Sequence, residues 1–128
     1  MPLRAGSVGS QAIVGIPHVH AVRRHAQLSW CNQVWPFETG FTATPAPQRG
    51  PFVLHAEIWP GVVADQTKQL LTADSSLIRD QAQVRALCQW AEALDDAGQL
   101  GQLFDEPLRL TAQQIQTCVQ EEGWVLGA

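Results

Sequence analysis

The strongest strand signal in this chain is Phe52-Val53-Leu54-His55-Ala56-Glu57-Ile58-Trp59-Pro60. Six of its first eight residues are apolar, which is typical of a strand that is covered on both faces. Glu57 is the exception, because a buried carboxylate costs free energy unless it is paired, hydrogen-bonded or bound to a metal. The stretch therefore predicts a buried central strand whose acid needs a partner.

The composition fits one compact domain that spans residues 1–128. Of the residues, 45% are hydrophobic, and a chain of this size buries roughly two-thirds of its unfolded surface. The net charge of −4 comes from 12 acids and 8 bases, of which Lys68 is the one lysine. This balance gives no basic patch for nucleic-acid phosphates, so any contact with nucleic acid would have to be local or metal-mediated.

Cysteine usage and hydropathy bear on the compartment. The three cysteines Cys31, Cys88 and Cys118 are far apart and form no C-x-x-C pair, which argues against a disulfide framework and against a zinc site. No stretch approaches the ~20 apolar residues of a membrane-spanning helix, and the start lacks the apolar region of a signal peptide. We expect a cytoplasmic protein that has no contact with a membrane.

Helical periodicity appears in three segments, where apolar residues recur at spacings of three and four. Each segment carries its own boundary signal, such as a glycine after its last turn or a threonine before its first. The segments are residues 8–25, with a kink or restart at Gly15-Ile16-Pro17; residues 80–97, closed by Gly98; and residues 111–122, capped by Thr111.

The remaining segments predict one more strand and loops. Residues 32–37 are strand-like, but Pro36 cannot donate a ladder hydrogen bond, so this strand should be short or at an edge. Residues 42–51 form a Pro-rich loop, and residues 61–79 fit a short helix and an exposed loop. The fold class is therefore α/β, with a small, mostly parallel sheet packed by helices.

Three acids lie at the ends of these elements: Glu38, Glu57 and Asp80. In an α/β sheet, sites form where the carboxyl ends of strands meet the starts of helices. Carboxylates gathered there suit Mg²⁺ or Mn²⁺, which prefer oxygen ligands, and could position two metals for phosphoryl transfer.

Two of these acids also have a simpler interpretation. Asp80 followed by Gln83 matches a helix N-cap with its capping-box partner, and this role is compatible with metal binding. Glu38 comes shortly before Gly40 and fits a solvated acid in a turn.

Glu57 has an alternative in an ion pair with Arg79 or Arg85, since a buried acid is commonly paired with an arginine. His55 shares its strand face with Glu57, because side chains two residues apart point the same way. It could act as a base or an extra ligand, or be a core histidine that is bonded to a backbone carbonyl.

Five different short motifs are spread over nearly the whole chain, at residues 6–12, 34–40, 55–60, 79–85 and 121–127. Their order and spacing resemble an uncharacterised bacterial family that looks related to predicted nucleases of the RNase H-like fold. Some members of that family carry labels from cobalamin or molybdopterin cofactor biosynthesis. The chain resembles the C-terminal half of these relatives, so the resemblance implies a partial RNase H-like fold that belongs to a larger unit.

The resemblance implies catalytic acids at Glu57 and Asp80, with Glu38 as a further match, and Mg²⁺ or Mn²⁺ bound by Glu57 and Asp80. An RNase H-like fold takes its leading aspartate from a first strand, and nothing before Gly6 could be that strand. The implied activity is metal-dependent phosphodiester hydrolysis or a catalytically incomplete remnant of it. A non-catalytic binding or assembly module and a role in cofactor biosynthesis are the alternatives.

Two predicted strands leave two open sheet edges, and a small open sheet is a poor structure on its own. We therefore expect a homo-oligomer, or a second chain that supplies the missing strands.

Overall fold

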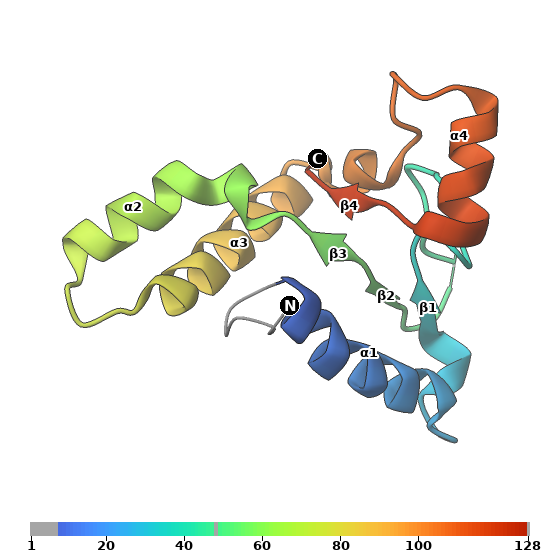
Figure 1. Cartoon of the computed structure of the whole chain (residues 1–128), viewed down its shortest axis with the longest axis horizontal. Coiled ribbons are helices and arrows are strands. Elements are labelled where there is room, and N and C mark those ends of the chain that lie inside the picture. The colour runs from blue at the N-terminus through green and yellow to red at the C-terminus, as the bar shows by residue number, and fades with distance from the viewer. Residues whose placement is uncertain (1–7, 48, 128) are drawn as a thin grey trace.

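The computed structural model describes residues 8–47 and 49–127, and Figure 1 shows their arrangement. The region before Gly6, where a leading strand would have to lie, is outside the described residues, and so are Gly6 and Ser7 of the first motif. The fold is mixed α/β, as predicted. Its helices are α1 (Val8–Arg24), α2 (Ala64–Ala73), α3 (Arg79–Asp96) and α4 (Ala112–Thr117), and its strands are β1 (Asn32–Val34), β2 (Val53–His55), β3 (Glu57–Ile58) and β4 (Val125–Leu126).

Short helical turns connect these elements. Three are 3-10 turns: η1 (Ser29–Cys31), η2 (Pro60–Val63) and η3 (Leu100–Phe104). The fourth is the π-helical turn η4 (Cys118–Glu122), which continues α4. Gly123 follows η4 with a φ of 76°, a backbone conformation that glycine adopts at little cost, and so turns the chain into β4.

The strands form two small parallel sheets. β1 pairs with β2, with Asn32 opposite Val53, and β3 pairs with β4, with Glu57 opposite Val125. The predicted single strand over residues 52–59 is therefore wrong in its length, because the chain changes partner at Ala56. The parallel pairing is confirmed, whereas the RNase H-like arrangement stays a prediction.

The predicted burial of this strand on both faces is also wrong. Val53 and Glu57 are exposed, because α2 and α3 pack mainly against each other and against η2 rather than over the strands. Val63, Thr67, Ala82 and Ala86 are buried in this helical hairpin, where the small alanine side chains let the two helices approach closely.

A separate core surrounds Trp35, which follows β1. Its ring meets the ring of Phe41 at 5.4 Å and that of Phe104 at 5.8 Å, both edge to face, and its indole N–H donates to the carbonyl of Phe104 at 3.2 Å. Pro36, joined to Trp35 by a cis peptide bond, is fully buried beside it. This contact ties β1 to η3 across 69 residues of sequence.

The helices begin and end close to the predicted residues. α1 runs through Pro17 as one helix, so a restart at that position is wrong. α3 ends at Asp96, and Gly98 follows with a φ of 67°, which is the predicted glycine stop. Thr111 Oγ1 accepts from the N–H of Gln114 at the start of α4, so the cap predicted there is confirmed.

Candidate functional site

The structure does not bring the two predicted metal ligands together. Glu57 is exposed on β3, and Asp80 is exposed in the first turn of α3. α2 lies between them, since α3 begins at the end of the helical hairpin that is remote from β3 (Figure 1). The ten residues of α2 span ~15 Å, well beyond the reach of one shared cation. In the described part of the chain, no group of three or more His, Cys, Asp or Glu side chains could hold a metal ion.

The predicted capping role of Asp80 is wrong by two residues. The N-cap of α3 is Ile78, and the side chain of Gln81, rather than that of Gln83, accepts a hydrogen bond from the Ile78 N–H at 3.2 Å. Asp80 lies inside the first helical turn, where a negative charge interacts favourably with the helix dipole.

Glu57 needs no buried partner, because its side chain reaches solvent. Among the described side chains, the ion pairs are Arg23–Glu38 and Lys68–Asp65. The predicted pairing of Glu57 with Arg79 or Arg85 is therefore wrong.

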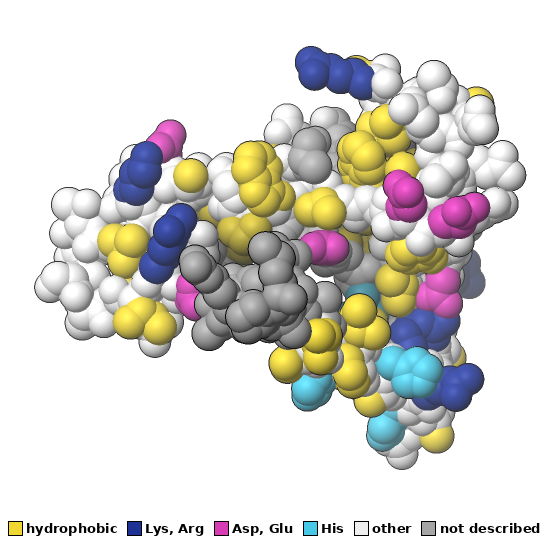
Figure 2. All heavy atoms as spheres, in the orientation of Figure 1, with side chains coloured by type: hydrophobic (Ala, Val, Ile, Leu, Met, Phe, Trp, Pro, Cys, Tyr) yellow, Lys and Arg dark blue, Asp and Glu magenta, His cyan; other side chains and the backbone are white. Residues whose placement is uncertain are grey.

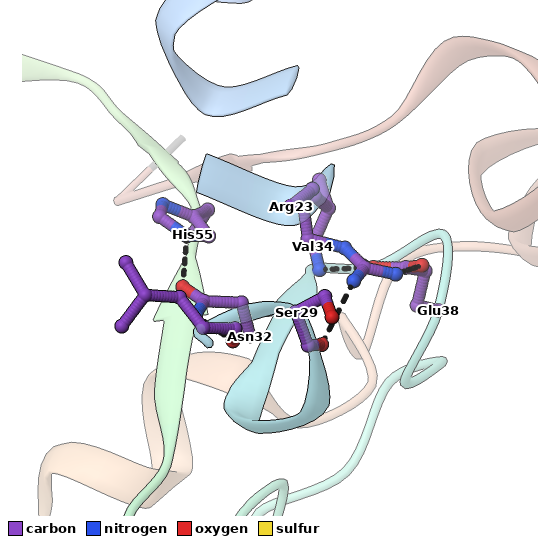
Figure 3. A network of polar contacts seen from close by, with 7 residues as sticks. Arg23, Ser29, Asn32, Val34, Glu38 and His55 are labelled. Carbon is purple, nitrogen blue, oxygen red and sulfur yellow. Dashed lines mark hydrogen bonds and ion pairs between the residues drawn. The ribbon is translucent and has the colours of Figure 1, made fainter. Parts of the chain in front are cut away.

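Glu38 is the most strongly bonded of the three predicted acids. Its carboxylate accepts two hydrogen bonds from the Arg23 guanidinium, with Nε at 2.9 Å from Oε2, and one from the Val34 N–H at 2.7 Å (Figure 3). The Arg23 hydrogen bond holds the pKa of Glu38 below its usual value; burial opposes this, and the hydrogen bond from the Val34 N–H adds to the lowering. The prediction of a solvated acid in a turn is confirmed for its place and exposure, but it did not include the bonds by which Glu38 fastens the end of α1 to the turn that follows β1.

Arg23 also donates to the carbonyl of Ser29 at 3.2 Å. Its guanidinium therefore joins α1, η1 and the turn after β1, and the pair with Glu38 raises the pKa of Arg23. With its fork occupied in this way, Arg23 acts as a structural clamp.

His55 lies close by on β2, bonded to Asn32 of β1 (Figure 3). The Nδ2 amide of Asn32 donates to the carbonyl of Leu28 at 2.5 Å, so its Oδ1 faces His55. His55 Nε2 must then carry the proton that it donates to Oδ1 at 2.7 Å. His55 is half-buried and its partner is the buried Asn32 side chain, so the predicted bond from a core histidine to a backbone carbonyl is wrong.

An open groove of about 480 Å³ runs beside this cluster. We call it the loop groove; its wall includes the prolines of the 42–51 loop and the exposed ring of Trp30, whose N–H already donates to the carbonyl of Gln27. A second open groove, of about 310 Å³, lies beside α4, and we call it the α4 groove. Its lining includes Leu110, Gln114, Cys118, Glu122 and Trp124. Glu57 lines neither of these two grooves.

Two groups of this cluster were not predicted from the sequence. The Arg23–Glu38 pair spans 15 residues and the Asn32–His55 bond spans 23, and no local spacing rule reaches so far. The one sequence feature that could have indicated Arg23 is the pair of arginines in the last turn of α1, where basic side chains interact favourably with the helix dipole. Asn32 carries no sequence signal of its burial.

The polar cluster around Arg23, Glu38, Asn32 and His55 has a structural role. The Glu38 carboxylate is bonded to a guanidinium and a backbone N–H, and His55 is bonded to the Asn32 amide. These bonds hold α1, β1 and β2 in a fixed relation. Comparisons of the chain with protein-family models, with curated proteins and with solved structures find no match.

Proposed function

We propose that this chain is a non-catalytic assembly module whose fold is completed by another protein chain. The observation that carries the proposal is the accessible surface of 9592 Å² at 14.0 kDa. A compact monomer of this mass exposes about 6,700 Å². The excess is surface that a folded chain ordinarily buries.

The small number of buried residues also supports a fold that another chain completes. Nine of the described residues are buried, and they are divided between the helical hairpin, the surroundings of Trp35, and the contact of η4 with β4. Each strand pairs with one other strand within the described residues, so each keeps an unpaired edge. An open edge is a template for another chain, and β-strand addition is a common form of protein recognition.

The exposed apolar side chains support association rather than chemistry. Ile13, Ile16, Trp59, Ile78 and Val84 are all more than half exposed. The predicted acids lie apart, and the one acid that is bonded serves a structural clamp. Metal-dependent hydrolysis and a role in cofactor biosynthesis rest on the family resemblance, and no described contact favours either of them.

Light scattering after size-exclusion chromatography, together with small-angle X-ray scattering, tests the proposal. We expect either a stable oligomer or an expanded monomer with a broad melting transition. A compact 128-residue monomer has a radius of gyration of about 14 Å. A monomer with that radius and a sharp transition would overturn the proposal. Among the described residues, no helix is both long and apolar enough to cross a membrane.

A further inference from the structure

α1 carries a stripe of apolar, histidine and arginine side chains that is exposed to solvent. Ile13, Ile16, His20 and Arg24 follow one another at spacings of three and four, so they lie on one face of the helix. All four are exposed, and Ile13 and Ile16 are 63% and 66% exposed. Figure 2 shows hydrophobic side chains along this helix, with histidine and basic side chains toward its end. We call these four residues the α1 stripe.

The α4 groove has the complementary character. Leu110, Cys118 and Trp124 give it an apolar part among threonine and glutamine side chains, and Glu122 places a carboxylate in its wall. An apolar helix face that carries anchors at i and i+3 is the usual occupant of such a groove. A cation at the end of that helix would meet the acid.

The segment that carries the α1 stripe and the segment that forms the α4 groove have opposite charges. Residues 8–25 contain no acid, and Arg24 is the arginine there that remains available, because Arg23 is paired with Glu38; residues 92–122 contain seven acids and one arginine, and Glu122 is the one of these acids that lines the α4 groove. All seven acids are exposed, and none forms an ion pair with another described residue. Complementary charge of this kind steers association and fixes its register.

α1 does not occupy the α4 groove of its own chain. The two helices lie at opposite sides of the molecule, with β1 between them (Figure 1), and α1 packs mainly against β1 and η1. The helix that would fill the groove is therefore that of another molecule, and a second copy of this chain brings the complementary stripe.

We propose that two copies of the chain form a closed dimer in which the α1 stripe of each copy docks in the α4 groove of the other. This inference rests on the proposed assembly function and names the partner. The reciprocal exchange gives two equal contacts around a twofold axis, which is the commonest symmetry of soluble oligomers. The chain exposes about 2,900 Å² more than a compact monomer of its mass, and a standard interface buries about 800 Å² on each partner. The available surface is therefore sufficient.

Charge exchange between Arg24 and Glu122 tests the reciprocal contact. We expect the wild type to run as a dimer, and Arg24→Glu and Glu122→Arg each to raise the dimer dissociation constant by about tenfold or more. An equimolar mixture of the two variants should restore the dimer. In the mixed dimer, one contact pairs the two substituted side chains, whose charges are both reversed, and the other keeps Arg24 with Glu122. Docking within one chain, or fraying of α1, would give no such rescue.

A matched pair of substitutions tests the apolar half of the stripe. Ile16→Glu should dissociate the dimer, whereas Val84→Glu should leave it intact, because Val84 is similarly exposed, at 61%, but lies on α3. Circular dichroism of each variant checks that the helices remain. Variants that stay dimeric, or a mixture that stays monomeric, would overturn the inference.

The radius of gyration distinguishes a failure of the dimer proposal from a failure of the proposed assembly function. A wild-type chain that is monomeric overturns the dimer. If that monomer also has a radius of about 14 Å, the assembly function falls with it. If its radius is clearly larger, the second copy is the wrong partner and the unfilled surface belongs to a different chain.

Discussion

His55 donates a hydrogen bond of 2.7 Å to Asn32, and this bond joins the side chains of β2 and β1 beside their backbone ladder. Asn32 is 3% exposed and turns its amide hydrogens toward the Leu28 carbonyl. Both ends of the amide are therefore satisfied in a partly buried site. Asn32 thus links β2, through His55, to the residue that precedes η1.

Asn32→Ala should lower the free energy of unfolding by about 1–3 kcal/mol, because His55 and the Leu28 carbonyl would each lose a partner in a partly buried site. Urea denaturation measures the change. Gln33→Ala, on the opposite face of the same strand, is the control and should cost clearly less. Equal losses in the two variants would contradict the role of Asn32.

Glu38→Gln should lower stability by under about 1 kcal/mol at neutral pH, because the pair with Arg23 is partly exposed. The pKa of Glu38 is lower in the folded chain, so its contribution is present above the unfolded carboxyl value of about 4.3 and is lost as the pH falls through the folded pKa. The gap between wild type and variant should shrink on acidification. Asp65→Asn alters the other described ion pair, which is far more exposed, and should change stability little. A gap that widens toward low pH would be inconsistent with the Arg23 contact.

Val63→Ala should destabilise the helical hairpin by about 1.5–3 kcal/mol, because Val63 is 0% exposed and its removal leaves a cavity. Val84→Ala makes the same change at an exposed position of α3 and should stay within about 0.5 kcal/mol. Thermal and urea unfolding give both values. If the two losses matched, the hairpin would not be the core that its burial indicates.

Thr111→Ala should cost about 1 kcal/mol, since its hydroxyl caps the Gln114 N–H at the start of α4. Asp80→Ala should cost less, because Asp80 interacts only with the dipole of α3 and does not cap it. Chemical denaturation of the two single variants compares them. A larger loss for Asp80 would restore the capping role that its sequence context indicates.

Millimolar Mg²⁺ or Mn²⁺ should leave the melting temperature of the wild type unchanged, because α2 separates Glu57 on β3 from Asp80 in the first turn of α3. Glu57→Gln and Asp80→Asn should behave in the same way. Differential scanning fluorimetry makes the measurement. A rise in the melting temperature that Glu57→Gln abolishes would favour the hydrolase over the assembly module.

Local signals predicted the helices well. The apolar spacing of α3, its glycine stop at Gly98 and the cap at Thr111 all act within a few residues, and the structure follows them. The predicted start of α3 differs from the observed one because both Gln81 and Gln83 are candidates for the capping-box partner. In the structure it is Gln81 that accepts from the free N–H of Ile78. Local pattern is therefore reliable for the existence of a helix and less so for its first residue.

The strand and the site were harder to predict. An apolar run such as residues 52–59 indicates that something covers it, but it does not indicate whether the covering element belongs to the same chain. The contacts of Glu38 and His55 join residues 15 and 23 positions apart, and they depend on how whole elements pack. β4 appeared in the sequence only as an apolar tail after Gly123, because two residues are too few for a periodic pattern.

The change of partner at Ala56 also sets an order of events during synthesis. β2 meets β1, which the ribosome has already delivered, whereas β3 must wait for Val125, 68 residues further along the chain. At 5–20 residues per second this delay is several seconds, roughly. The hairpin of α2 and α3 consists of local contacts and can form within that interval. The nascent chain therefore presents β3 unpaired until Val125 and Leu126 have been synthesised and have left the ribosome.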